Sequence, residues 1–157
     1  HTHLLNPLFI LHTGLFILAI AIVDSENTTN WAWFLEHLAN VVKTDRTITF
    51  ISDRHTGLLE SIPITFLFAH HTFYLQHLQW NLQDKMRYTN KMHHVGLLSK
   101  FRACAYALPV TAFNSNLESF KASGRLLATA FLKDLPPAYW ANACFRYAPA
   151  HEYIAPN

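Results

Sequence analysis

Asp53 is the residue whose type and position most clearly suggest chemistry. It closes a stretch from Arg46 to Asp53 that is typical of a strand, and a turn and a helical pattern follow it. Functional groups in open α/β sheets gather where strands reach their carboxyl edge. A carboxylate at that edge can hold Mg²⁺, because hard cations prefer oxygen ligands. Asp53 therefore has two interpretations, as a metal ligand or as the cap of the helix that follows.

Two further acids, Asp24 and Glu26, follow the apolar stretch Leu15–Val23. Together with Asp53 they could form a carboxylate trio around a metal ion. Acids that precede a helix more often cap it and interact with its dipole. We therefore favour a capping role for Asp24 and Glu26 and keep the metal trio as the alternative.

The chain contains 11 histidines, and some of them have the spacing of metal ligands. The relevant groups are His70, His71 and His77, and the pair His93 and His94. Zinc needs four ligands, Cys104 and Cys144 lie far away in the sequence, and adjacent histidines point in different directions. We therefore expect structural or solvated histidines. No Gly-rich phosphate loop and no G-x-S-x-G motif is present.

The composition limits the class of protein. The 157 residues allow one domain or a fragment of a larger one. Hydrophobic residues make up 51% and charged residues 14%, which excludes a disordered chain. The net charge of +2 is too small to indicate a nucleic-acid partner. Two cysteines without a C-x-x-C pair indicate a reducing compartment. The chain begins with histidine and carries no recognisable signal peptide, so we expect an excerpt or an incomplete gene product.

The most apolar run, from Leu8 to Val23, has sixteen residues with a polar break at His12-Thr13-Gly14. A membrane span needs about 20 apolar residues. We therefore expect buried strands here, Leu15–Val23 in particular, and keep a membrane helix as the alternative. We further expect Leu15–Val23 and Thr47–Ile51 to be neighbours in one sheet.

The remaining elements follow from periodicity. An amphipathic helix from Trp31 to Val42 is expected to pack on the sheet. The other expected elements are a helix at 57–66 with Pro63 near a boundary or kink, a short strand at 66–69, a helix at about 72–82, helical hairpins over 97–131 and a short helix opened by Pro136-Pro137. This order favours an α/β sheet domain with a helical extension.

Several motifs resemble the Mutator-like element (MULE) transposases of plants. That family has an apolar strand, a Val-acid-x-Glu turn and a W-x-W-F-L helix, which match Leu18–Asn27 and Trp31–Leu35. The likeness continues at Ile48–Arg54 and Gly57–Glu60, through residues 69–81, and again at residues 136–147.

The resemblance implies a ribonuclease H-like fold and a DDE-type reaction on DNA in the nucleus. In that reaction two Asp and one Glu hold Mg²⁺ or Mn²⁺ ions that activate the attacking oxygen. Asp53 matches the second catalytic Asp of the family. His77 matches the histidine of the family's C-x-x-H motif, in which Tyr74 stands here in place of the cysteine. No small-molecule substrate and no membrane partner is implied.

The sequence also departs from the family. The first catalytic Asp would lie one residue before His1, and the third acid is not found after Arg146-Tyr147. Glu152 is the nearest carboxylate, and its surroundings do not match. The family's hairpin loop is missing at His12-Thr13-Gly14, so either Thr13-Gly14 serves as a tight turn or the strand order at this edge is disturbed. We expect weak expression and aggregation.

We therefore expect a degenerate, inactive transposase fragment that binds no metal productively. Its fold class would be α/β, an incomplete ribonuclease H-like mixed sheet with flanking helices and a C-terminal helical extension. The expected organisation is a core at 1–83, a polar linker at 84–96, a helical segment at 97–147 and an irregular tail at 148–157. The alternatives are a domesticated DNA- or protein-binding module and a small membrane protein anchored through residues 8–23.

Overall fold

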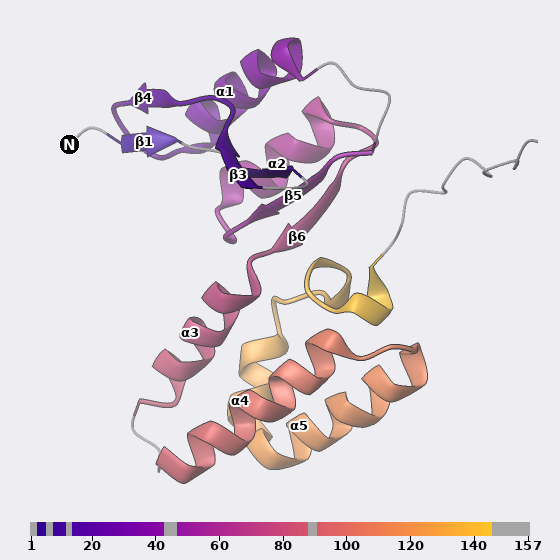
Figure 1. The fold of residues 1–157 in the computed structure, drawn as a ribbon. Coiled ribbons are helices and arrows are strands. Elements are labelled where there is room, and N and C mark those ends of the chain that lie inside the picture. Colours follow the sequence, from indigo (N-terminus) through magenta and orange to yellow (C-terminus); the bar gives the residue numbers. More distant parts are fainter. Residues whose placement is uncertain (1–2, 6–7, 12–13, 43–46, 88–90, 146–157) are drawn as a thin grey trace, which may run out of the picture. The chain divides into compact units, whose positions relative to one another are not determined.

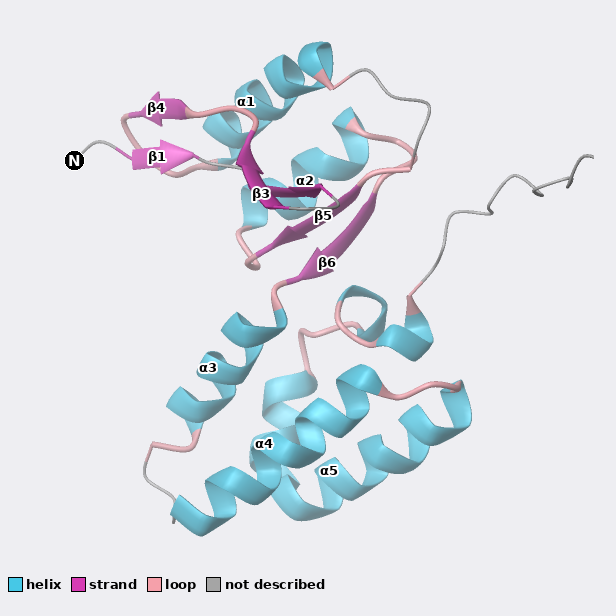
Figure 2. Cartoon of the chain, viewed as in Figure 1, coloured by secondary structure: helices cyan, strands magenta, loops and turns pink. Residues whose placement is uncertain are grey.

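A computed structural model describes residues 3–5, 8–11, 14–42, 47–87 and 91–145. These residues form mixed α/β structure, as expected, with more helix than strand (Figure 2). The strands are β1 (His3–Leu5), β2 (Leu8–Leu11), β3 (Gly14–Ile17), β4 (Ala21–Val23), β5 (Thr49–Ser52) and β6 (His70–Phe73). The helices are α1 (Thr28–Val41), α2 (Thr56–Thr65), α3 (Leu75–Lys85), α4 (Lys91–Tyr106), α5 (Val110–Leu132) and two 3-10 turns, η1 (Pro137–Tyr139) and η2 (Asn142–Cys144).

The chain divides into two compact units. Unit 1 comprises residues 1–49 and 54–69, and unit 2 comprises residues 50–53 and 70–157. The segment expected to be a polar linker, 84–96, contains the end of α3 and the first turns of α4. No described helix is both long and apolar enough to cross a membrane.

The expectation of one sheet shared by Leu15–Val23 and Thr47–Ile51 is wrong. The described strands form three two-stranded sheets: β1 with β4, β2 with β3, and β5 with β6. The first two pairs are antiparallel, whereas β5 and β6 run parallel (Figure 1). The expected strand Leu15–Val23 is also divided, because residues 18–20 separate β3 from β4. The expected burial of this strand on both faces is wrong as well: Ala21 and Val23 are buried, whereas the other large side chains from residue 17 on, Ile17, Leu18, Ile20 and Ile22, are exposed. An apolar run contains no signal for where a strand breaks.

The two antiparallel ladders are one residue out of register. Leu5 pairs with Ala21 in the first ladder, and Leu8 pairs with Ile17 in the second. On the side of β3 and β4, the offset falls at residues 18–20, which belong to no strand.

The connection between β2 and β3 is short. Leu11 pairs with Gly14, so only His12 and Thr13 join the two strands. A two-residue connection is the shortest that an antiparallel hairpin commonly uses. Of the two alternatives, the tight turn is the one that holds: β2 and β3 pair with each other without a longer loop, and the alternative of a disturbed strand order at this point is wrong. The expected aggregation stays a prediction.

Unit 1 is built on the packing of α1 against α2. Asn27 caps α1 by accepting a hydrogen bond from the N–H of Asn30 at 2.9 Å. The predicted amphipathic face of α1 is buried, and its members are Trp31, Phe34, Leu35 and Leu38. At the start of α2, a Cβ on Gly57 would lie 2.9 Å from both Thr28 Cα and Trp31 Cδ1. Only glycine allows the two helices to approach this closely.

The predicted helix at 57–66 is confirmed, whereas the strand expected at 66–69 is wrong. Pro63 lies in the last turn of α2, and the N–H of Phe66 closes the helix on the Ile62 carbonyl at 2.8 Å. The N–H of Ala69 then bonds the Phe66 carbonyl at 3.0 Å, which forms a turn rather than a strand. The strand comes next, as β6, and therefore the helix expected at about 72–82 begins only at Leu75.

Unit 2 contains the predicted helical hairpin, α4 against α5 (Figure 1). Its core is aromatic: Phe101 and Phe120 are fully buried, and Phe131 and Trp140 nearly so. The indole N–H of Trp140 donates to the Leu135 carbonyl at 3.2 Å. The short helix expected after Pro136-Pro137 is present as η1.

Helix α5 is broken at Arg125, whose φ of 47° and ψ of −126° are not helical. A side chain with a Cβ rarely adopts a positive φ, and such strain costs on the order of 1–3 kcal/mol. We expect Arg125→Gly to raise the free energy of unfolding by about 1 kcal/mol, because glycine adopts this backbone conformation without strain. Urea denaturation measures the change. Arg125→Ala is the control, because it keeps the Cβ; an equal gain from alanine would show that strain is not the cause.

Candidate functional site

Asp53 follows the last residue of β5, at the carboxyl end of that strand, and its side chain is exposed. The expectation that Asp53 ends a strand is confirmed. The residue at the cap of α2 is His55, whose Nδ1 accepts the Gly57 N–H at 3.1 Å. The interpretation of Asp53 as the cap of that helix is therefore wrong.

The strand next to Asp53 contributes His71. The Oγ of Ser52 donates to the Asp53 carbonyl at 2.7 Å, and the Nε2 of His71 lies 2.7 Å from the same Oγ. Because the hydroxyl has a single proton, the ring nitrogen is the donor in the second bond. The N–H of Tyr74 also bonds the Ser52 carbonyl at 2.7 Å. These bonds join the end of β5 to β6.

The ring of His71 is held neutral. Burial lowers its pKa to about 4, and the nearby Asp53 carboxylate opposes that effect only in part. The ring packs edge-on against Phe73 and Tyr139, with centroid distances of 5.8 Å to each. Since the Ser52 proton is directed to a carbonyl and the histidine donates to Ser52, this pair does not form an activated nucleophile.

A segment from much later in the chain supports this cluster. The Oγ1 of Thr72 donates to the Tyr139 carbonyl at 2.7 Å, and the ring of Phe73 stacks on that of Tyr139 at 4.9 Å. Sequence reasoning singled out residues 136–143 for their family resemblance, but it did not connect them with β6. It also did not identify Ser52 or Thr72. No local pattern links residues that lie 67 positions apart.

Asp24 and Glu26 lie in unit 1 and hold the first turn of α1. An Oδ of Asp24 accepts from the Asn30 side-chain amide at 2.9 Å, and this bond is the main cause of the lowered pKa of Asp24. Glu26 accepts from the Trp31 indole N–H at 3.2 Å. The cap itself is Asn27, so the expectation that these acids cap the helix is corrected: they bind side chains of its first turn.

His77 and His70 both lie against aromatic rings. His77 lies 5.1 Å from both Tyr74 and Trp80, and His70 lies 5.5 Å from Phe145, as ring centroids. His93 and His94 belong to α4, but their side chains, like the whole of Glu152, lie outside the described residues.

A metal site would need ligands that converge. Among the residues that the structure describes, no three His, Cys, Asp or Glu side chains are grouped so that they could hold a metal ion. Asp24 and Glu26 belong to unit 1 and Asp53 to unit 2, so the trio considered above stays a prediction. The described residues do not fit a two-metal centre, which needs several carboxylates to hold both ions.

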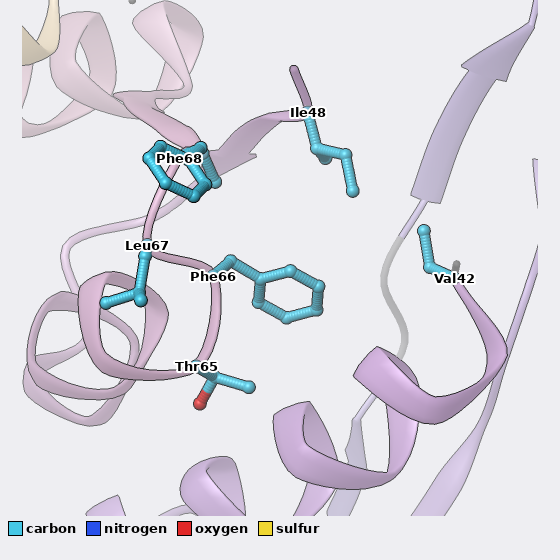
Figure 3. A pocket seen from close by; sticks show the side chains of 7 residues that line it. Val42, Ile48, Thr65, Phe66, Leu67 and Phe68 are labelled. Carbon is cyan, nitrogen blue, oxygen red and sulfur yellow. The ribbon is translucent and has the colours of Figure 1, made fainter. Parts of the chain in front are cut away.

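An apolar pocket of about 290 Å³ lies in unit 1, beside the loop that follows α2. Figure 3 shows the Phe66 ring turned toward Val42 and Ile48 across this pocket. Thr65 supplies the one hydroxyl in its lining, and Leu67 and Phe68 beside it are strongly exposed. The pocket offers no acid, base or nucleophile for catalysis.

The order of elements around Asp53 agrees with the motifs quoted above. An apolar strand and the W-x-W-F-L helix α1 precede β5, and Asp53 follows it. Residues 9–81 match the family model of the MULE transposase domain. The MULE match runs from β2 into α3 and covers somewhat less than half of the chain. It includes Asp53, Tyr74 and His77, whereas the resemblance at residues 136–147 lies outside it. A comparison with curated proteins found no significant match.

Proposed function

We propose that this chain is a transposon-derived MULE transposase domain of plant origin, a degenerate copy that binds DNA but does not cut it. The ancestral enzyme would have had a ribonuclease H-like fold and a DDE-type reaction, with metal-dependent strand cleavage and transfer in the nucleus. The match over residues 9–81 supports this ancestry. Loss of the reaction is supported by one observation above all: in the described part of the chain, no three His, Cys, Asp or Glu side chains form a group that could hold a metal ion.

A reaction between two metal ions depends on the charge around them. Phosphoryl transfer between two metals needs carboxylates that hold both ions and that together offset their charge. Asp53 instead has as its neighbour a neutral, largely buried His71 whose ring donates to Ser52. A single exposed carboxylate does not position two ions, so Mg²⁺ or Mn²⁺ would not be bound productively.

A second candidate function is a protein-binding module. Leu67 and Phe68 are 76% and 81% exposed beside the apolar pocket. Contiguous exposed apolar side chains of this kind mark interaction sites in soluble proteins. This candidate would use unit 1 and needs no metal.

We expect the 157-residue chain not to nick supercoiled plasmid in Mg²⁺ or Mn²⁺. Wild type, Asp53→Ala and the control Asp134→Ala should give the same background, measured as conversion to the open-circular form on a gel. Asp134 is a suitable control because it is an exposed acid outside the family match. Metal-dependent nicking that Asp53→Ala abolishes and Asp134→Ala retains would overturn the proposal and show that other acids complete the site.

A further inference from the structure

Helix α3 and its N-cap residue carry a row of aromatic side chains that we call the aromatic face: Tyr74 at the cap, and His77 and Trp80 within the helix. Residues three apart lie on one side of a helix, one turn above another. The rings follow one another at centroid distances of 5.1 Å in both steps. Tyr74 is 48% exposed and Trp80 is 50% exposed, so about half of each ring remains available to a ligand.

The charge of the chain is divided unequally between its two units. Unit 2, which carries the aromatic face, contains nine Lys and Arg against five Asp and Glu. Unit 1 contains three Lys and Arg against five Asp and Glu. The overall net charge of +2 is therefore the sum of a basic unit and an acidic unit. A basic surface favours a polyanionic partner.

Basic side chains also lie close to the aromatic face itself. Lys85 and Arg87 are exposed at the C-terminal end of α3. Arg87 pairs with Asp84 at 3.1 Å, but both groups are about two-thirds exposed, and such pairs contribute little energy. From α4, the Nε of Arg102 donates to Gln79, whose buried side chain lies on another side of α3 than the exposed Trp80.

We propose that the aromatic face of α3 is a stacking site for the unpaired bases of single-stranded DNA. Exposed Trp and Tyr rings stack on nucleobases of any sequence, while nearby cations hold the phosphates. Bases in a duplex are already stacked on one another and do not offer a free face. The inference rests on the proposed function for DNA as the partner, and it adds the form of DNA and the residues that contact it.

The test uses the full chain and a labelled oligothymidylate of about 16 nucleotides, the upper site size of such stacking surfaces. Fluorescence anisotropy should show Trp80→Ala weakening the affinity by about tenfold. Tyr74→Ala should weaken it to a smaller extent, and Trp80→Phe, which keeps a ring, should restore most of the loss.

Trp33→Ala is the matched control. Trp33 is 47% exposed on α1, and its ring is tilted against that of His37 at a centroid distance of 4.6 Å, so it reproduces the tilted Trp–His pair of α3 in the acidic unit. The Trp33→Ala variant should bind the oligothymidylate as tightly as wild type does. Thermal melts show which variants keep the fold; if Trp80→Ala does not, Tyr74→Ala and Trp80→Phe decide the question.

The outcomes separate the two proposals. Equal losses from Trp33→Ala and Trp80→Ala, or no loss from Trp80→Ala and Tyr74→Ala, would overturn the stacking site. Equal binding of a duplex and the oligothymidylate, insensitive to Trp80, would keep DNA as the partner and overturn only the stacking site. No binding of either DNA would overturn both the stacking site and DNA as the partner.

Discussion

Replacing Phe101 with alanine is expected to lower the free energy of unfolding by about 3–5 kcal/mol. The side chain of Phe101 is fully buried on α4, where it joins other rings of the unit 2 core. Its centroid lies 4.9 Å from that of Trp140, 5.3 Å from that of Phe131 and 5.7 Å from that of Phe120. Alanine would remove all three contacts and leave a cavity. The surrounding helices could fill that cavity only by shifting.

Urea denaturation followed by circular dichroism measures this loss. Phe68→Ala is the matched control, since it removes the same ring from a position that is 81% exposed, and its effect should stay within about 0.5 kcal/mol. Phe101→Leu should fall between the two, because leucine fills part of the space. A loss for Phe101→Ala no larger than that of Phe68→Ala would mean that this aromatic cluster does not carry the stability of unit 2.

The second large effect concerns pH and His71. The pKa of His71 is lowered from 6.5 to about 4 in the folded chain, mainly by burial. Between these pH values the unfolded chain binds a proton that the folded chain does not, so stability is complete above pH 6.5 and falls as the pH falls toward 4. The full difference corresponds to about 3 kcal/mol, and the partial exposure of the ring reduces our expectation to about 2 kcal/mol.

His71→Gln isolates this contribution, because the amide keeps a donor for Ser52 and does not titrate. Between pH 6.5 and pH 4, the free energy of unfolding of the variant should fall by about 2 kcal/mol less than that of wild type. Urea titrations at each pH measure it. His37→Gln is the control: His37 is exposed on α1, where its Nδ1 lies 2.8 Å from the Trp33 carbonyl. His37→Gln should follow wild type. A full wild-type slope in His71→Gln would show that other groups cause the acid sensitivity.

Helices were predictable from the sequence where an apolar pattern recurs with helical spacing. Helix α1 was found in this way because its buried residues follow one another at such intervals. The strands were less predictable. The run Leu15–Val23 revealed neither the break at 18–20 nor the exposure of Ile20 and Ile22. β6, with two histidines and a threonine, has little strand character of its own. Its strand conformation comes from pairing with β5, which is a tertiary effect.

The candidate site, too, was predictable only where it depends on neighbouring residues in the sequence. The position of Asp53 at a strand end depends on residues next to it, so local sequence was sufficient to predict it. The contacts of His71 with Ser52 and Tyr139 join segments far apart in the chain, and only the fold reveals them. The basic character of unit 2 was also hidden, because the net charge of the whole chain averages over both units.

The break at residues 18–20 determines which length changes the chain can accept between β3 and β4. In an uninterrupted strand, Ile17 would share a face with Ala21 and Val23, yet Ile17 is 60% exposed while those two are buried. The offset of one residue between the two ladders therefore goes with a reversed alternation between β3 and β4. Deleting one residue there would give both ladders a common register and would keep Ile17 and Ala21 on opposite faces. Deleting two residues would instead turn one of the two strands over, because a further shift of one exchanges the faces.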